Sequence, residues 1–312
     1  MKLKSLDIGR LSTKNNVFFA PMAGYSDYAF RGLCSLLGAG VTVTEMVSAK
    51  GLIYKNENTA CLLEQSPDEN LSVAQLFGHE PDVMRAACES EFLSAFEVID
   101  INMGCPVNKI YGNGEGSKLM ETPDLAEKII KECVKSGKTI TVKFRAGLCE
   151  NHLLASDFAV MAEQAGAKSV TIHGRTREGM YSGIVHYDEI AKAKNKVTIP
   201  VIANGGIFTA EDADLMIERT GADGIAIARG ALSDPLLFAK ITGTNTDFTV
   251  IDCVDYLIEK RKLTQPDVIV AHAMRKFVAQ LFKGVRGGKE AKLAVFAAET
   301  TDEIKRICRE VL

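Results

Sequence analysis

A cysteine follows directly after a strand predicted from residues 98–103. This run is mostly apolar, and Gly104, Cys105 and Pro106 come next in the sequence. Gly allows unusual backbone conformations before the thiol and Pro restricts the backbone after it, and Asn102 adds a polar group that a hydrophobic core does not need. A lone Cys is more often a core residue, but active sites of α/β folds lie at the carboxyl ends of strands. The neighbours therefore favour Cys105 as a reactive group.

Polar residues also end several other predicted strands. The interior of a closed barrel is filled by Val, Ile and Leu, so Gln75, Asn102, Lys143 and His173 are unusual at such positions. Each residue alone is weak evidence for a site. Together they predict a polar pocket with a cationic floor.

Glycine-rich turns follow the last two predicted strands. Asn204-Gly205-Gly206 and Ala228-Arg229-Gly230 offer backbone N–H groups and one guanidinium where barrels commonly bind a phosphate. A phosphate site beside a polar cluster suits a phosphorylated planar cofactor, with non-covalent FMN as the natural candidate. Lys143 would stabilise negative charge on a reduced flavin, and Gln75 would bind the amide edge of its ring. The expected cofactor-binding residues are Pro21, Met22, Ala23, Gln75, Lys143, His173, Asn204, Gly205, Gly206, Ala228 and Arg229.

Eight short apolar runs alternate with helical patterns, which predicts a parallel sheet covered on both faces. The runs are 16–24, 41–46, 71–78, 96–104, 139–144, 169–175, 198–206 and 223–230. Eight such units in about 230 residues indicate an α/β fold of the (β/α)8 TIM-barrel type. A doubly wound sheet is the alternative, but no GxGxxG follows the first run, and residues 112–119 lack the Lys-Ser/Thr ending of a P-loop.

The pattern changes after about residue 241. Residues 250–264, 269–283 and 290–311 look helical, so we expect a catalytic barrel over 1–241 and a small all-helical domain over 248–312. Residues 246–312 contain 12 Lys/Arg and 10 Asp/Glu, against 25 and 30 in residues 1–245. The excess lies in Arg275, Lys276, Lys283, Arg286, Lys289 and Lys292. Such a cluster indicates either a solvated helix face or a nucleic-acid contact.

Composition restricts the broad class of protein. The chain has 312 residues, 46% hydrophobic and 25% charged, with a net charge of −3. These values indicate a globular protein that does not capture nucleic acid by bulk charge. No apolar leader or membrane-length run is present, and the eight cysteines form no CxxC pair. We therefore expect a cytoplasmic protein with free thiols, no metal and no membrane partner.

The sequence resembles the tRNA-dihydrouridine synthase family over about residues 15–240. The elements GCPV and HGRTR are specific as a pair, and the tail resembles the helical RNA-binding domain of the family more loosely. The matching segments are 20–31, 44–46, 73–78, 100–120, 141–147, 171–183, 200–207 and 228–238, followed by 275–277 and 283–288.

The resemblance implies an FMN-dependent oxidoreductase that uses NADPH and reduces the C5–C6 double bond of specific uridines in tRNA. Hydride would reach C6 from reduced flavin, and Cys105 would protonate C5 as the general acid. Asn102 would hold the uracil edge, Lys143 and His173 would hold flavin and substrate, and Arg175 would add a polar contact. The uridine must be flipped out of the tRNA, and contacts from the basic tail, including Lys283 and Arg286, would offset that cost. A monomeric state is expected.

Three other functions compete with this interpretation. An FMN barrel of the dihydroorotate dehydrogenase type would reduce a free pyrimidine, but it has no use for a basic helical tail. An RNA-binding protein with a non-catalytic role would not need Cys105 and Lys143. A flavin-free sugar-phosphate isomerase would lack the yellow colour of oxidised flavin.

Overall fold

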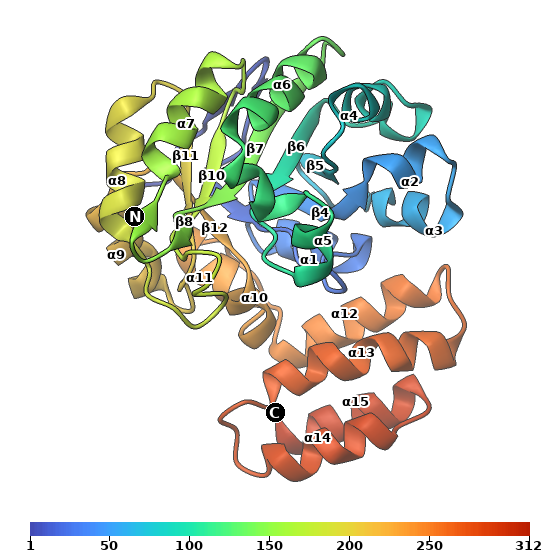
Figure 1. Cartoon of the computed structure of the whole chain (residues 1–312). Helices are drawn as coiled ribbons and strands as arrows, with labels where there is room; N and C mark the ends of the chain where they lie inside the picture. Colours follow the sequence, from blue (N-terminus) through green and yellow to red (C-terminus); the bar gives the residue numbers. More distant parts are fainter.

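Eight parallel strands close a barrel in the computed structural model, which describes the backbone of residues 1–312 and the side chains of all but Glu57 and Asn58 (Figure 1). Each predicted apolar run overlaps one of these strands, and the last strand pairs with the first. The predicted TIM barrel is therefore confirmed. The strands are β3 (Val17–Phe19), β4 (Val41–Ser48), β5 (Ser72–Phe77), β6 (Val98–Met103), β7 (Thr139–Arg145), β10 (Val170–His173), β11 (Val201–Asn204) and β12 (Gly224–Ile227).

Helices cover the outside of the barrel and bury its outward-facing strand residues (Figure 1). The helices of this part of the chain are α1 (Tyr28–Leu36), α2 (Ala49–Ile53), α3 (Glu57–Ala60), α4 (Pro81–Cys88), α5 (Asn108–Gly112), α6 (Pro123–Val134), α7 (Ala155–Gln164), α8 (Tyr187–Lys196), α9 (Ala210–Thr220), α10 (Arg229–Ser233) and α11 (Leu237–Thr242). Short 3-10 turns lie at η1 (Cys61–Leu63), η2 (Glu91–Leu93) and η3 (Gly116–Glu121).

The inside of the barrel changes character along its axis. A separate apolar cluster contains Phe18, Val41, Val73 and Val98 from the early parts of four strands. The hairpin of β1 (Asp7–Ile8) and β2 (Leu11–Ser12) adds Ile8 to this cluster and so packs against the inner core. The inward-facing residues nearer the carboxyl ends of the strands are polar. A second hairpin, β8 (Gly147–Cys149) with β9 (His152–Leu153), follows β7. Neither hairpin was predicted from the sequence.

Four helices follow the barrel and form a separate layer, orange to red in Figure 1. They are α12 (Val250–Lys262), α13 (Asp267–Leu281), α14 (Gly288–Ala297) and α15 (Thr301–Val311). The single helix predicted over 290–311 is wrong, because α14 ends before Thr300. Thr300 and Glu303 form a capping box that starts a new helix at that point.

Polar and aromatic contacts dock α12 and α13 onto the barrel. Arg261 of α12 donates two hydrogen bonds to Asp27, at 2.7 and 3.0 Å, and the same carboxylate caps α1 through the N–H of Phe30. Phe277 of α13 packs edge-on against Phe30, with ring centroids 5.1 Å apart. The docked surface lies next to the loop between β3 and α1, at the carboxyl end of the barrel.

None of the helices described is long and apolar enough to cross a lipid bilayer. The described side chains also contain no group of three or more His, Cys, Asp or Glu placed to bind a metal ion.

Candidate active site

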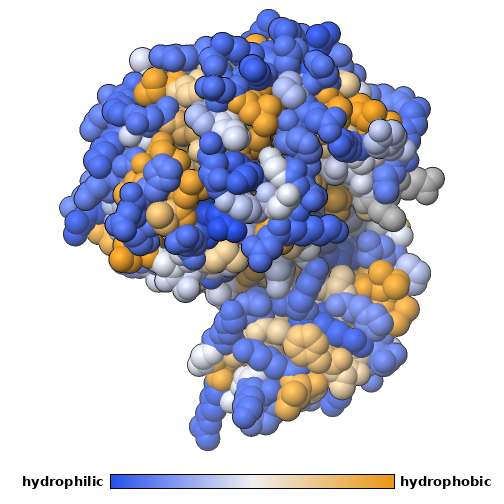
Figure 2. Space-filling model, in the orientation of Figure 1, coloured by the Kyte–Doolittle hydropathy of each residue, from blue (hydrophilic) through white to orange (hydrophobic). Residues whose placement is uncertain are grey.

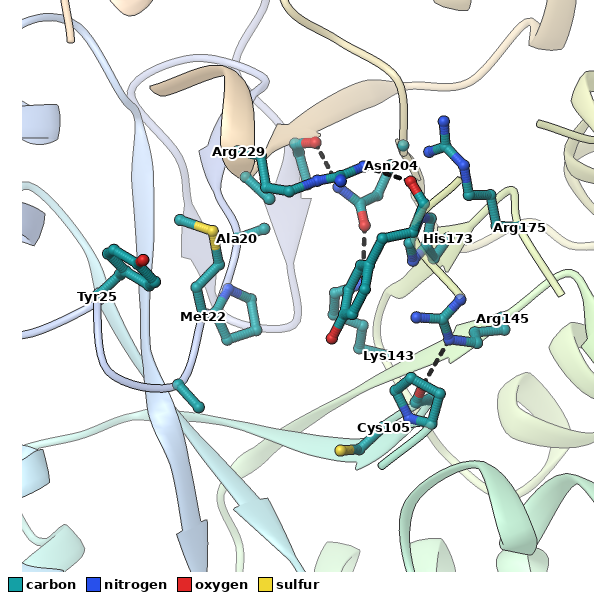
Figure 3. A pocket seen from close by; sticks show the side chains of 18 of the residues that line it. Ala20, Met22, Tyr25, Cys105, Lys143, Arg145, His173, Arg175, Asn204 and Arg229 are labelled. Atoms are coloured by element: carbon teal, nitrogen blue, oxygen red, sulfur yellow. Dashed lines mark hydrogen bonds between the residues drawn. The ribbon is translucent and has the colours of Figure 1, made fainter. Parts of the chain in front are cut away.

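A cavity of about 370 Å³ opens at the carboxyl ends of the barrel strands (Figure 3). Of the sequence-predicted site residues, all the cofactor-binding set, Cys105, Asn102 and Arg175 line it, whereas Lys283 and Arg286 do not. The cavity also contains residues to which the sequence did not assign a role. These are Tyr25, Met46, Arg145, Tyr181, Phe208 and Gln280, among others.

Cys105 lies in a loop that is bonded from three sides. Asn102 Oδ1 accepts hydrogen bonds from the backbone N–H groups of Gly104 and Cys105, at 3.1 and 2.9 Å. Ser117 donates to the carbonyl of Cys105 through its hydroxyl at 2.8 Å, and Arg145 Nε donates to the carbonyl of Gly104 at 2.8 Å. A Cβ on Gly104 would lie only 3.1 Å from the Cα of Phe144, so the close approach to β7 needs glycine. The thiol is therefore held in a fixed place at the cavity.

The electrostatic surroundings keep the Cys105 thiol protonated at neutral pH. Burial raises the pKa of Cys105 above its ordinary value, while the N–H of Val107 and the charge of Arg145 act in the opposite direction. A protonated thiol is a proton donor, so the geometry suits a general acid rather than a thiolate nucleophile.

Lys143, which is half-buried, supplies a cation to the same cavity. Its Nζ donates to Asn204 Oδ1 at 3.0 Å, and Asn204 Nδ2 donates to the carbonyl of Ala226 at 2.7 Å. Burial lowers the pKa of Lys143 to about 8, the charge of Arg145 acts in the same direction, and Asp100 opposes it. The ammonium group is thus charged at neutral pH but costly to hold there, and a nearby anion would stabilise it.

The glycine turn after β11 faces two residues of the HGR segment. Gly205 and Gly206 have φ values of +120° and +76°, which favour glycine. A Cβ on Gly205 would lie 2.8 Å from His173 Cδ2 and 3.5 Å from Arg175 Nη1. Burial, together with the neighbouring cations, lowers the pKa of His173 well below its usual value, so the imidazole is neutral. The sequence placed Arg175 with the substrate, but its guanidinium lies at the predicted phosphate turn.

Arg175 has a hydrogen-bonding group that the described residues leave unused. Its Nε donates to the carbonyl of Gly183 at 2.7 Å, but Nη1 is buried without a partner among them. Arg229, predicted as the phosphate ligand, donates through Nη2 to the carbonyl of Tyr181 at 2.7 Å. An unpaired buried guanidinium N–H beside two glycines is the arrangement that a phosphate would satisfy.

Gln75 and Asn102 are joined by a hydrogen bond inside the barrel. Asn102 Nδ2 donates to Gln75 Oε1 at 2.9 Å, and Gln75 is fully buried. The amide of Asn102 is therefore occupied by Gln75 and by the Cys105 loop. The role of Asn102 at the uracil edge stays a prediction.

The helical domain contributes one side chain to the cavity. Gln280 of α13 lines it, and no side-chain hydrogen bond of Gln280 is present among the described residues. One turn earlier, Lys276 Nζ lies 5.2 Å from the ring centroid of Tyr25, which also lines the cavity. No pattern near Gln280 in the sequence indicated this, because the contact depends on how α13 docks.

The basic cluster of the helical domain is divided by the structure. Arg275 donates two hydrogen bonds to the carbonyl of Ala298, at 3.0 and 2.6 Å, and so links α13 to the end of α14. Lys283, Arg286 and Lys289 are exposed around the turn between these helices.

Leu293 and Phe296 of α14 are exposed as well, and Figure 2 shows hydrophobic side chains across the front of this domain.

The fold and the site define a TIM-barrel protein whose carboxyl rim carries a protonated thiol, a half-buried lysine and a turn of two glycines. The sequence model of the dihydrouridine synthase (Dus) family matches residues 18–311. This chain belongs to that family, which confirms the resemblance.

Similar proteins agree with this assignment. The chain is 40% identical over 232 residues to tRNA-dihydrouridine synthase B of Pasteurella multocida, covering 74% of this chain and 70% of that protein. It is 33% identical over 309 residues to the Pseudomonas putida protein of the same name, covering 96% and 92%.

Solved structures share the fold at low identity. Histamine dehydrogenase from Rhizobium sp. 4-9 aligns with a TM-score of 0.60 and 14% identity, over 76% of this chain and 47% of that protein. A structure of TcOYE with pHBA aligns with a TM-score of 0.57 and 11% identity, over 77% and 92%.

Proposed function

We propose that this protein is an FMN- and NADPH-dependent tRNA-dihydrouridine synthase that reduces the C5–C6 double bond of uridine. The observation that carries the proposal is the meeting, in one cavity of a Dus-family chain, of the protonated Cys105 thiol, the Lys143 ammonium and the unpaired Nη1 of Arg175. Each group matches one need of the reaction: a proton, a counter-charge and an anchor for a phosphorylated cofactor.

The cavity fits FMN on its own chemistry. The turn at Gly205 and Gly206, with Arg175 and Arg229 beside it, would hold the phosphate. Lys143 would lie at the ring and stabilise negative charge there, and the neutral His173 would offer a hydrogen bond without adding charge. When bound and reduced, FMN supplies the hydride that reaches C6 of the uracil ring.

Cys105 supplies the proton. Its S–H donates to C5 of the uracil as negative charge develops there, which leaves the thiolate in the loop fastened by Asn102 and Arg145. Arg145 is close enough to act on the pKa of Cys105, and its charge stabilises the thiolate formed in this step. Solvent then restores the thiol.

The helical domain would bind the tRNA and present one nucleotide to the cavity. Lys283, Arg286 and Lys289 would contact phosphates, and Gln280 would make a hydrogen bond to the flipped nucleotide. An enzyme for a free pyrimidine needs neither contact, so these residues favour RNA as the substrate.

The proposal is tested with unmodified tRNA. The purified protein, loaded with FMN, is incubated with NADPH and tRNA from a strain that lacks dihydrouridine, and the nucleosides are quantified by mass spectrometry. We expect dihydrouridine at defined positions of the tRNA, and no reduction of free orotate or uracil. Absence of dihydrouridine under conditions where NADPH reduces the bound flavin would overturn the proposal.

A further inference from the structure

Asp100 is a buried acidic residue of β6 that the proposed reaction does not use. Its side chain points into the barrel, and the residue is only 4% exposed. Thr141 Oγ1 donates to Asp100 Oδ1 at 2.7 Å, and Gln75 Nε2 donates to Asp100 Oδ2 at 2.7 Å. Burial of a carboxyl group inside a barrel costs free energy, so we expect Asp100 to have a structural or functional role.

Asp100 begins a series of hydrogen bonds that ends at Cys105. Gln75 donates to Asp100, Asn102 donates to Gln75, and Asn102 accepts from the N–H groups of Gly104 and Cys105. Strand register makes this possible, because Gln75 pairs with Asp100 across β5 and β6, and Asp100 pairs with Thr141 across β6 and β7.

The series has only one consistent direction. Burial raises the pKa of Asp100, but the hydrogen bonds from Gln75 and Thr141 and the charge of Lys143 favour its ionised form. In that form the carboxylate accepts hydrogen bonds but cannot donate them, so Gln75 turns its NH2 toward Asp100 and its carbonyl toward Asn102. Asn102 must then turn its NH2 toward Gln75, which leaves its carbonyl for the backbone of the Cys105 loop. Reversal of either amide would set two donors or two acceptors against each other inside the barrel.

We propose that Asp100 is a positioning residue that fixes the amide orientations of Gln75 and Asn102 and thereby holds the Cys105 loop at the cavity. The value of this placement for catalysis rests on the proposed function, because that function makes Cys105 the proton donor. The placement itself does not depend on turnover.

A different role for Asp100 is that of counter-charge to Lys143. The two groups influence each other electrostatically, although the hydrogen bond of Lys143 goes to Asn204. The two roles differ in what they require. Positioning requires an acceptor that faces Gln75, whereas a counter-charge requires a negative charge.

Three substitutions separate the roles. Asp100→Asn removes the charge, but its carbonyl can still accept from Gln75 while its NH2 donates to Thr141. Asp100→Leu removes both the charge and the acceptor. Asn102→Ala releases the Cys105 loop directly and shows the size of the full effect.

The readout is the alkylation rate of Cys105 by iodoacetamide in the flavin-loaded protein, followed by peptide mass spectrometry. Cys149, on β8 outside the series, is half-buried and reports general loosening in the same sample. We expect Asn102→Ala and Asp100→Leu to raise the Cys105 rate by roughly three- to tenfold, because a released loop exposes the thiol. Asp100→Asn should stay within about twofold of the unmodified protein, and Cys149 should not change.

Two results would overturn the proposal. One is an unchanged Cys105 rate in Asp100→Leu or in Asn102→Ala. The other is an Asp100→Asn rate as high as that of Asp100→Leu, which would assign the effect to charge. If Asp100→Leu does not fold, Gln75→Met removes the next member of the series and must give the same rise. Dihydrouridine formation, measured separately, shows whether the proposed function holds whatever the alkylation result.

Discussion

The barrel rim and the helical domain arrange their polar side chains in opposite ways. At the rim, Gln75 and Asn102 are buried and Lys143 is half-buried, and all three are bonded to fixed partners. In the helical domain, Lys283 and Arg286 are exposed around a turn that contains Gly284 and Gly287. Chemistry on a base needs donors that are already in place, because their reorganisation would raise the barrier. Attraction of phosphates needs charge but little fixed geometry.

Cys105→Ala tests the rim at its most sensitive point. We expect flavin reduction by NADPH to stay nearly unchanged, whereas single-turnover reduction of tRNA should slow by about 10²–10⁴-fold, as for the loss of a general acid. Rapid-mixing absorbance measurements give both rates in one preparation. Cys149→Ala is the matched control, and an unchanged tRNA rate in Cys105→Ala would remove the thiol from the mechanism.

Arg175→Ala tests the phosphate turn. The variant should retain flavin about 10- to 100-fold less tightly, because a charge-assisted bond to the phosphate is lost. Arg229→Ala should also lower flavin occupancy, but less, because Arg229 already bonds to the carbonyl of Tyr181. Flavin titrations by fluorescence measure both effects. If Arg175→Ala keeps full affinity, the phosphate lies elsewhere.

The lowered pKa of Lys143 predicts a loss of activity at alkaline pH. Its pKa is about 8, so the ammonium form dominates below that pH and is lost as pH rises. The single-turnover rate on tRNA should therefore fall by about tenfold from pH 7 to pH 9. Cys105 does not explain this limb, since burial raises the pKa of its thiol. Lys143→Met should be slow at every pH and lack the decline between pH 7 and 9, and a decline that persists would point to another group.

Charge reversal of Lys283, Arg286 and Lys289 to Glu tests the helical domain as a source of RNA affinity. We expect tRNA affinity to fall on the order of tenfold, and each lost phosphate contact should flatten the slope of log affinity against log salt by up to about 0.9. Filter binding across salt concentrations measures both quantities. Flavin content should not change, because these residues lie outside the cavity. Unchanged affinity and slope would make the cluster a solvated surface.

Gln280 belongs to the helical domain but lines the cavity of the barrel, so its substitution tests whether it acts with the cavity residues or with the phosphate contacts. Gln280→Ala should raise the KM for tRNA by about two- to fivefold, the size of one neutral hydrogen bond, with the salt slope unchanged. Gln265→Ala, in the loop before α13, is the control. A change in slope would place Gln280 with the phosphate contacts, and no change at all would leave it outside the substrate site.

The order and type of most elements could be predicted because their signals are local. The run at 139–144 is β-branched and buried on both faces, and β7 occupies Thr139–Arg145. The hairpin of Asp7–Ile8 with Leu11–Ser12 was missed because two-residue strands carry no periodic pattern. The break before Thr300 was also missed, although a Thr followed three residues later by Glu303 is a capping-box signal.

The candidate site was predictable where a strand end places a residue, and less so where contacts decide. Cys105 and Lys143 follow from position along their strands. Asp100 was overlooked because it lies inside a mostly apolar run and acts through Gln75. The orientation of Arg175 toward Gly205 depends on the loop after β10, and no spacing along the chain reveals it.

Asp27 helps to fix the distance between the cavity and the helical domain. One carboxylate caps the first barrel helix and holds Arg261 of the helical domain, and the packing of Phe277 against Phe30 adds a second contact between the two parts. Under the proposed function, a folded tRNA would have to reach across this fixed distance between the helical domain and the cavity. The uridine that enters the cavity would then be the one that lies at this distance from the RNA contacts of the helical domain.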